Sequence, residues 1–250
     1  LSPTAVTDPS GLNVTWTGVP QFDAGSYPVT ATVNDSNYAG TATGTFTIDQ
    51  APSTVTLTCP ASVTYDGSAQ TPCSAGVTGA GGLNQPVPVS YANNINVGTA
   101  TATASYAGDA NHVGASSSAT FKILYLPAGT MCLGAPGHQI LEPINADGTS
   151  VFKQKSTVAA KFRVCDANGG SVGTPGVVDS FRLKQIISGT VANVDELVDS
   201  TTPDTQFRWS SSDEQWIFNM STKTLNAGKT YVYLITLNDG STIQYQFGLK

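Results

Sequence analysis

Charged side chains are scarce in this sequence, and basic ones are missing from its first half. Lys, Arg, Asp and Glu make up 11% of the 250 residues, against about 25% in average soluble domains. Residues 1–124 carry six acids and a single base, Lys122, whereas residues 125–250 carry eleven acids and ten bases. Nucleic acids and anionic lipids are bound through clusters of Lys and Arg, so we predict no nucleic-acid partner. The missing bases fit either a neutral extracellular surface or a surface that trypsin-like proteases cannot cut.

Long apolar runs are also absent. No stretch approaches the roughly 20 apolar residues that span a bilayer, and no signal peptide is recognisable. The chain begins with Leu1 rather than Met. We therefore expect a mature or excised piece of a larger protein, whose export signal and anchor lie outside it. We expect no membrane insertion by this segment.

Side chains that catalyse reactions or bind metals are few and scattered. The only histidines are His112 and His138, and there is no Gly-x-Ser-x-Gly elbow, although a hydrolase needs a base beside its nucleophile. Adjacent carboxylates occur at 195–196 and 213–214, and we place both pairs in solvated loops. The loop after Asp166 lacks the closing glutamate of an EF-hand. We predict no enzyme activity, no catalytic residues, no metal and no cofactor.

Short alternating segments dominate the sequence, and two stretches of it are alike. Apolar residues alternate with Thr over residues 27–33 and again over 100–106, as they do in half-buried strands. Three landmarks recur at offsets of 73, 74 and 75, namely Gly25, Asn37 and Phe46 as Gly98, Asn111 and Phe121. A period of this length indicates two copies of one domain. Short strands with regular turn signals favour a β-sandwich.

The first copy lacks the opening of the second. Leu1 aligns near Thr71, so residues 51–70 have no counterpart at the start of the first copy. A sandwich without its first strand exposes an open edge, which is a template for another strand. Two outcomes stay open: a frayed first domain, or a neighbouring chain that fills the gap and links subunits into a fibre.

The sequence changes character at about Tyr125, where the repeat stops and aromatic residues become frequent. The motif Asn-Asp-Gly at 238–240 is a strong signal for a tight hairpin turn. We expect a short helical turn over 191–198. We expect strands over 178–187, 205–209, 216–220, 230–237 and 242–249. The domain boundaries that follow are 1–50, 51–124 and 125–250.

Aromatic residues in the last domain occur two positions apart, and such pairs share one face of a strand. Phe207 with Trp209 and Trp216 with Phe218 are two examples. Cross-strand packing in the core explains these pairs. The alternative is an exposed platform for sugar rings, with Trp209 and Trp216 as the ligand-binding residues. Burial of both tryptophans would exclude that platform.

The four cysteines are Cys59, Cys73, Cys132 and Cys165, and none of them forms a Cys-x-x-Cys motif. An even count in a Thr-, Ser- and Gly-rich chain indicates disulfides and an oxidising compartment. Sequence alone allows three pairings. The domain division favours Cys59–Cys73 and Cys132–Cys165, because each pair then lies inside one domain.

Two stretches connect the chain with known families. Residues 51–124, through the motifs at 65–73 and 106–112, resemble the MBG-type bacterial immunoglobulin-like repeat, and residues 1–50 resemble a truncated copy. Residues 125–250 resemble the PxKF-type domain found at the C-terminus of large bacterial surface proteins, although Ala159 replaces the proline that names it. The resemblance implies an extracellular repeat protein with these two disulfides, no catalytic residues and no known ligand.

Taken together, these features predict an all-β protein of tandem immunoglobulin-like β-sandwich domains that is secreted to the extracellular space or cell surface. We predict a structural or adhesive stalk or assembly module of a larger bacterial surface protein or fibre. Its partners would be neighbouring copies in a fibre or a surface glycan. The alternative is a carbohydrate-binding accessory region of a secreted enzyme.

Overall fold

The computed structural model describes residues 3–202 and 206–250, and its regular structure is almost entirely β. Within these ranges 21 strands form six sheets, and the single exception is a 3-10 turn at Ala80–Gly82. The prediction of an all-β fold built from immunoglobulin-like sandwiches is confirmed. Residues 203–205, which include the start of one expected strand, lie outside the described part.

The chain divides into two compact units. The first comprises Leu1–Cys59, Cys73–Ser90 and Ala102–Ala119, and the second comprises Pro60–Pro72, Tyr91–Thr101 and Thr120–Lys250. Residues 51–124 thus contribute to both units. The domain boundaries at 50 and 124 stay a prediction.

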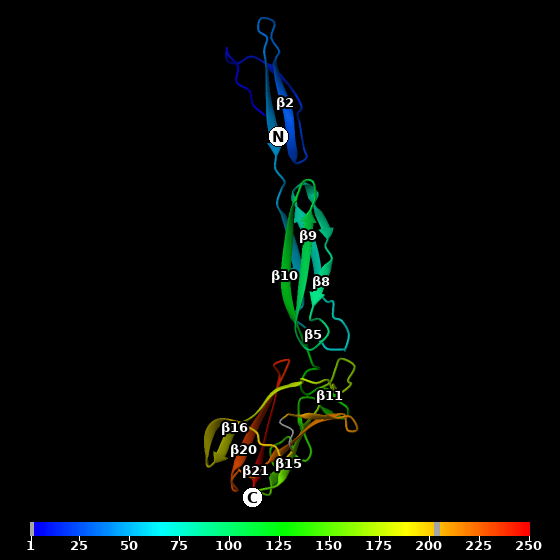
Figure 1. Cartoon of the computed structure of the whole chain (residues 1–250), viewed down its shortest axis with the longest axis vertical. Helices are drawn as coiled ribbons and strands as arrows, with labels where there is room; N and C mark the ends of the chain where they lie inside the picture. Colours follow the sequence, from blue (N-terminus) through cyan, green and yellow to red (C-terminus); the bar gives the residue numbers. More distant parts are fainter. Residues whose placement is uncertain (1–2, 203–205) are drawn as a thin grey trace. The chain divides into compact units, whose positions relative to one another are not determined.

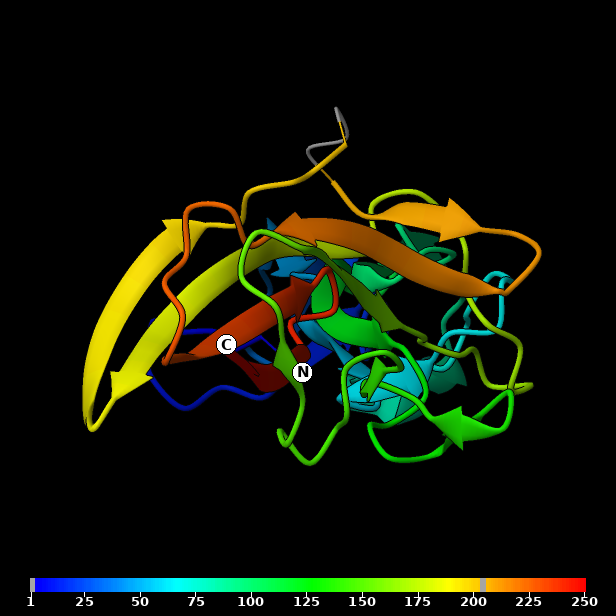
Figure 2. The same cartoon turned by 90° about the horizontal axis from the view of Figure 1, so that it is seen from below.

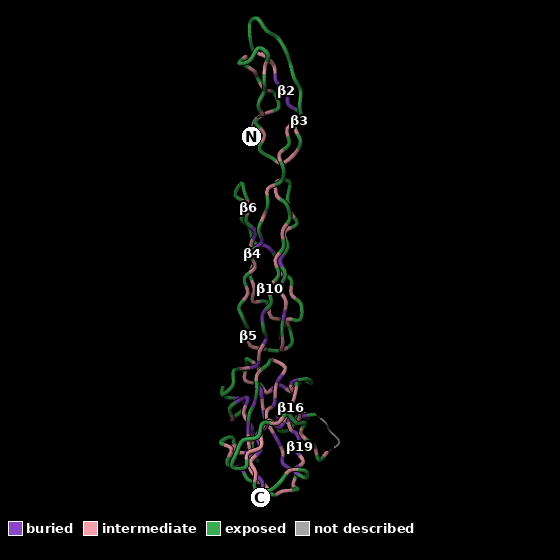
Figure 3. The backbone as a smooth tube through the Cα atoms, turned by 90° about the vertical axis from the view of Figure 1, so that its left-hand side faces the viewer, coloured by how far each residue is buried: buried purple, intermediate pink, exposed green. Residues whose placement is uncertain are grey.

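The first unit opens with a three-stranded antiparallel sheet in the order β1 (Val14–Thr17), β2 (Gly25–Val33) and β3 (Thr41–Ile48) (Figure 1). Its alternating residues place Trp16 beside Ala31 and Ala31 beside Ala42 on one face. Only Val29 and Ala31 of this sheet are buried. Figure 3 shows the result as a tube that is mostly green and pink around β2 and β3. The described part of residues 1–50 therefore contains a single sheet rather than a sandwich.

Residues 53–124 form two sheets. One has the order β4 (Ser53–Thr58), β6 (Ser74–Gly79) and β7 (Asn84–Pro86). The other has the order β5 (Ser62–Thr64), β10 (Val113–Leu124), β9 (Gly98–Gly108) and β8 (Val89–Ala92), of which the last three lie side by side in Figure 1. Val55, Val77 and Val87 pack with Ala104 of β9 in a small core. Small residues dominate this core because the strands alternate Val or Ala with Thr.

The C-terminal sandwich has two main sheets and one short ribbon. The five-stranded sheet has the order β14 (Val151–Phe152), β21 (Thr242–Leu249), β20 (Thr230–Leu237), β16 (Val178–Ser188) and β17 (Thr190–Leu197). The four-stranded sheet has the order β13 (Ile140–Leu141), β15 (Thr157–Phe162), β19 (Gln215–Ser221) and β18 (Arg208–Ser210). The ribbon pairs β11 (Met131–Cys132) with β12 (Ala135–Pro136). Both main sheets contribute aromatic and aliphatic residues to one large core, including Phe162, Phe218, Tyr231 and Phe247.

Most of the expected strands of this domain are present. The hairpins β18–β19 and β20–β21 and the strand β16 are confirmed. The short helical turn expected over 191–198 is wrong, because Thr190–Leu197 is a strand that pairs with β16 (Figure 2, yellow). Gly189 turns the chain with a φ of 72°. The β-branched residues Thr190, Val191 and Val194 then favour the extended backbone over a helix.

Candidate functional site

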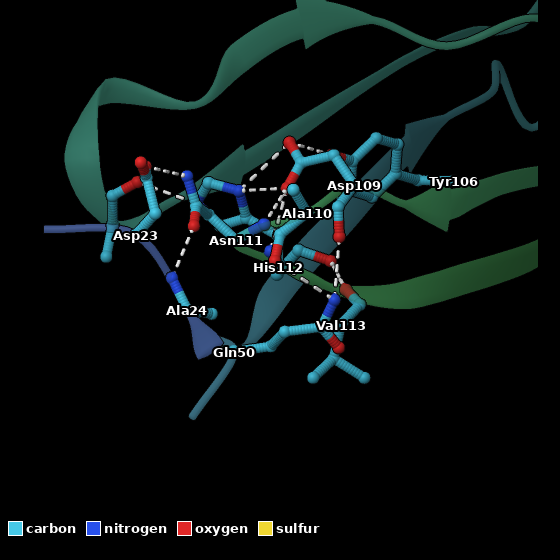
Figure 4. Close-up of polar contacts among 11 residues, drawn as sticks. Asp23, Ala24, Gln50, Tyr106, Asp109, Ala110, Asn111, His112 and Val113 are labelled. Atoms are coloured by element: carbon cyan, nitrogen blue, oxygen red, sulfur yellow. Dashed lines mark hydrogen bonds and ion pairs between the residues drawn. The ribbon is translucent and has the colours of Figure 1, made fainter. Parts of the chain in front are cut away.

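A dense set of polar contacts surrounds the turn between β9 and β10 (Figure 4). Asp109 Oδ1 accepts hydrogen bonds from the backbone N–H groups of Asn111 at 2.8 Å and His112 at 2.7 Å. The Tyr106 hydroxyl donates to Asp109 Oδ2 at 2.7 Å. These donors, the Tyr106 hydroxyl foremost, lower the pKa of Asp109 to about 2. Asp109 therefore organises the turn as a carboxylate at all but very acidic pH.

Glycine is required next to this turn. Gly108 has a φ of +90°, and a Cβ atom built on it would lie 2.7 Å from the carbonyl oxygen of His112. An L side chain would be strained by the backbone angle and would also collide with the turn. The tight turn thus depends on the Gly108-Asp109 sequence.

Asn111 connects this turn to residues that precede β2. Its Oδ1 accepts the backbone N–H of Ala24 at 2.7 Å, and its Nδ2 donates to Asp23 Oδ1 at 2.9 Å. Its backbone carbonyl accepts the N–H of Ala51 at 2.8 Å, and Gln50 Nε2 donates to the carbonyl of Asp109 at 2.7 Å. We call residues 109–112 with residues 23–24 and 50–51 the polar joint. Both ends of the Asn111 amide are satisfied across this joint (Figure 4).

His112 joins the turn to the backbone of Ala80. Its Nδ1 lies 2.9 Å from Asp109 Oδ1, and its Nε2 lies 2.8 Å from the carbonyl oxygen of Ala80. Both neighbours are acceptors, whereas a neutral imidazole carries one N–H. The imidazolium form satisfies both contacts, and the Ala80 carbonyl and then Asp109 raise the pKa of His112. Sequence analysis did not predict this role, because Ala80 lies 32 positions from His112.

The two tryptophans proposed as a sugar platform differ in burial. Trp216 lies in the core with 5% of its surface exposed, and its Nε1–H donates to the carbonyl of Val172 at 2.9 Å. Trp209 is half-buried, with its ring 5.5 Å from that of Trp216 and closely packed on the backbone of Gly173. The expectation for Trp216 is wrong, because alternation along β19 turns its ring inward together with Phe218.

The four cysteines form the two disulfides that the domain division favours. Cys59 is bonded to Cys73, 14 positions further along the sequence, and Cys132 is bonded to Cys165, 33 positions further along. Cys132 and Cys165 are each 1% exposed. Their role is structural, since no thiolate is left to act as a nucleophile or metal ligand in these pairs.

The adjacent carboxylates have structural surroundings. Asp195 and Glu196 lie on β17 rather than in the loop that we expected, and Asp195 Oδ1 accepts from Lys184 Nζ at 2.9 Å. This contact lowers the pKa of Asp195. The backbone carbonyls at 213 and 214 accept the guanidinium of Arg163 at 2.7 and 3.0 Å. Residues 3–202 and 206–250 contain no cluster of three His, Cys, Asp or Glu side chains that could hold a metal ion.

A cleft of about 260 Å³ opens in the C-terminal sandwich. Its apolar lining includes Phe181, Phe207 and Phe218, and its polar lining includes Asp179 and Arg182. Aromatic faces beside hydrogen-bonding groups suit a ligand with a small ring that has both an apolar face and polar substituents. The sequence analysis placed Phe207 and Phe218 in the core. It did not predict the two charged residues of the lining, Asp179 and Arg182, which lie on β16.

Comparison with known proteins identifies one segment. Residues 1–52 match the family model of the MBG domain. The match covers the sheet of β1, β2 and β3 and also residues 23–24 and 50–51, which bond to the 109–112 turn. No curated protein matches this chain. Across the described residues, no helix has the length and apolar character needed to cross a membrane.

Three solved structures are similar to the chain at low identity. The three N-terminal domains of the bacteriophage RB49 Highly Immunogenic Outer Capsid protein are 15% identical, with 97% of this chain and 89% of that chain covered and a TM-score of 0.34. Zebrafish RET cadherin-like domains 1 to 4 are 8% identical, covering 91% and 58%, with a TM-score of 0.23. The Bacteroides ovatus glucan-utilization protein SGBP-B, in complex with a mixed-linkage heptasaccharide, is 11% identical, covering 95% and 60%, with a TM-score of 0.23. TM-scores this low carry no argument about function.

Proposed function

We propose that this chain is a non-enzymatic spacer or assembly module of a larger extracellular protein. Two MBG-type repeats precede a C-terminal PxKF-type domain in this proposal. The match of residues 1–52 to the MBG domain, the two disulfides and the near absence of basic residues from residues 1–124 support it. Disulfides persist in oxidising compartments outside the cytosol.

The polar joint is the observation that carries the proposal. A spacer must resist bending where one repeat meets the next, and a short linker alone does not provide that resistance. Here Asn111 bonds to Ala24 and Asp23, which lie 87 and 88 positions away in sequence. The linker residues Gln50 and Ala51 bind the same turn. Each such bond contributes about 0.5–1.5 kcal/mol, so the joint holds residues 1–50 against the following repeat.

One backbone contact of this turn recurs in the first repeat. At the equivalent place in the first repeat, Asp35 Oδ1 accepts the N–H of Asn37 at 2.7 Å, as Asp109 does for Asn111 at 2.8 Å. The offset is 74 positions in both cases. Asn37 therefore matches Asn111 in position and in this one backbone contact, which makes it a suitable control for a substitution of Asn111.

Backbone NMR relaxation of the full chain tests the spacer function. Residues 14–48 and 53–58 should share one rotational correlation time in the wild type, because the joint couples them. Asn111→Ala should separate the two values and speed amide exchange at Ala24. Asn37→Ala is the matched control and should change neither. Independent tumbling in the wild type would overturn the proposal.

A carbohydrate-binding accessory role is the second candidate, and the cleft beside Phe181 favours it. Titration with soluble β-glucan and xylan oligosaccharides should shift the methyl and ring signals of the cleft residues if this role is real. Phe181→Ala should then weaken binding more than tenfold, whereas Tyr38→Ala, which removes an exposed aromatic elsewhere, should have no effect. Saturating sugar that produces no shift would eliminate this candidate.

A further inference from the structure

The chain passes from residues 53–124 into the C-terminal sandwich through Tyr125, which is 3% exposed. Its backbone N–H donates to Asp239 Oδ2 at 3.3 Å, and its hydroxyl donates to Asn238 Oδ1 at 2.8 Å. Burial, followed by the charge of Asp239, raises the pKa of Tyr125, so the hydroxyl stays a donor at neutral pH. Tyr125 is therefore bonded to the turn between β20 and β21 through both its backbone and its side chain.

Two further residues of the preceding segment contact the sandwich. The carbonyl oxygen of Tyr65 accepts the N–H of Ala167 at 2.7 Å, and the Tyr65 ring lies edge-on to that of Tyr125, with 6.5 Å between the centroids. Tyr65 and Val97 are half-buried and pack against the core of the sandwich. We call Tyr65, Val97 and Tyr125 with Ala167 and residues 238–239 the second joint. All of its residues lie inside the second compact unit.

The linker residue is equivalent in the two joints. Tyr125 follows Phe121 by four positions, as Gln50 follows Phe46. Both linker residues donate from their side chains into the next hairpin turn. Gln50 Nε2 donates to the carbonyl of Asp109 at 2.7 Å, and the Tyr125 hydroxyl donates into the β20–β21 turn. Two different side chains thus make the same kind of bond from the same position of the repeat.

The residue that precedes a strand glycine is also used in both joints. Ala24 precedes Gly25 at the start of β2. Val97 precedes Gly98 at the start of β9. The N–H of Ala24 donates to Asn111 Oδ1 in the following hairpin turn, and Val97 packs against the core of the following domain. One contact is polar and the other is apolar, but both come from the same position.

The turns that occupy these positions share a length and an internal bond. Each has four residues between two neighbouring strands of one sheet, 109–112 between β9 and β10 and 238–241 between β20 and β21. In each, an Asp carboxylate accepts the N–H two positions further on at 2.8 Å, Asp109 in the first turn and Asp239 in the second. Such a bond shapes the turn locally. The other residues of the two turns differ.

We propose that each repeat ends in one docking surface, made by the residue before its strand glycine and by its linker residue, and that the partner of this surface is a four-residue hairpin turn with an internal Asp-to-backbone bond. The surface then accepts either another repeat or a domain of different sequence, provided that the domain carries such a turn. An array can thus be extended or ended without a change of joint. This inference rests on the proposed spacer function and specifies how the spacer binds the domain that follows.

Amide exchange in the full chain tests the second joint. Tyr125→Phe removes the hydroxyl and keeps the ring, and Asn238→Leu removes its acceptor. Each should speed exchange at Ala167 by about fivefold, and the double variant should be no faster than either. Tyr231→Phe, at a buried tyrosine whose hydroxyl bonds elsewhere in the same sandwich, is the matched control and should leave Ala167 unchanged. Additive effects, or equal acceleration at Ile235 in the core of β20, would overturn the proposal by showing a general loss of stability.

The polar joint tests the equivalence of the two surfaces. Gln50→Leu should speed exchange at Ala51, whose N–H bonds across that joint, by about fivefold and leave Ala167 unchanged. Tyr125→Phe should do the reverse. An Ala51 amide that does not respond to Gln50→Leu would overturn the common docking surface. A shared correlation time across the polar joint, together with no response to Tyr125→Phe, would refute this inference and leave the spacer function standing.

Discussion

The two histidines show how neighbouring groups give one residue type opposite properties. His112 faces a carboxylate and a carbonyl, and these acceptors raise its pKa. His138 is 9% exposed, its Nδ1 has no hydrogen-bond partner, and burial lowers its pKa. The sequence placed both in turns, and nothing in their local sequence separates them.

An NMR titration of the wild type can resolve both residues at once, because the chain has two histidines. We expect His112 to titrate above the usual value of about 6.5 and His138 below it. Asn111→Ala should leave the midpoint of His138 in place. Two midpoints on the same side of 6.5 would contradict the assigned contacts.

The shifted pKa values of His112 and Asp109 in the polar joint also predict how the stability of the fold depends on pH. His112 has a folded-state pKa above its unfolded value, so its contribution is fully present below about pH 6.5 and is lost as the pH rises through the folded-state pKa. Asp109 has a folded-state pKa of about 2 against 3.8, so its contribution is present above 3.8 and is lost as the pH falls towards 2. The difference in melting temperature between wild type and His112→Gln should therefore be largest near about pH 5 and shrink in the alkaline direction. A difference that is constant from pH 5 to 9 would show that His112 is not charged in the fold.

The disulfides make the third residue-level prediction. Cys132–Cys165 closes a longer loop than Cys59–Cys73, 33 against 14 positions. In the chain-entropy account these loops correspond to about 4 and about 3 kcal/mol, and removal of Cys132 and Cys165 also opens space in the core. The double variant Cys132→Ala/Cys165→Ala should thus lower the urea midpoint of its own unit more than Cys59→Ala/Cys73→Ala lowers that of the first unit. Urea unfolding under oxidising conditions measures both, and the reverse order would contradict the expectation.

At the scale of elements, alternation in the sequence predicted most strands but not their partners. The hairpins β18–β19 and β20–β21 follow from residues that are local to each turn, and Asn238-Asp239-Gly240 alone sets the second. The strand β17 was missed because Val191 to Val198 was interpreted as a short helical turn. Its pairing with β16, which lies outside that segment, makes it a strand. The polar joint was missed because Asn111 binds Ala24 across 87 positions. Contacts at such separations depend on the assembled fold and leave no local pattern.

Trp209 and Gly173 provide a test of packing between elements. A Cβ atom on Gly173 would lie 2.3 Å from Cε2 of the Trp209 ring. The indole is rigid and also contacts Trp216, so Gly173→Ala should destabilise the C-terminal sandwich by about 1–3 kcal/mol. The same substitution in a Trp209→Ala background should cost little, because the colliding ring is gone. A double-mutant cycle from urea unfolding measures the coupling, and additive losses would show that the two residues do not touch.

At the scale of the whole molecule, hydrophobic burial is unevenly distributed. The second unit contains one large cluster with Phe162, Tyr231, Tyr245 and Phe247 at its centre. The first unit has the small cluster of Val55, Val77, Val87 and Ala104, and its three-stranded sheet buries only Val29 and Ala31. Since burial of apolar area is the main stabilising contribution, we expect the first unit to be less stable than the second. The segment that matches the MBG domain contains the least buried sheet.

This difference predicts an order of unfolding that the three tryptophans report directly. Trp16 lies on β1, whereas Trp209 and Trp216 lie in the C-terminal sandwich. Each indole N–H gives its own NMR signal, so urea unfolding can be followed at all three without a substitution. The folded signal of Trp16 should disappear at a lower urea concentration than those of Trp209 and Trp216, which should disappear together because their rings are in contact and Trp216 is bonded to Val172. Asn111→Ala should move the Trp16 transition to still lower urea and leave the other two in place. Simultaneous loss of all three signals would mean that the chain unfolds as one cooperative body, and that the small cluster of the first unit draws its stability from the rest of the protein.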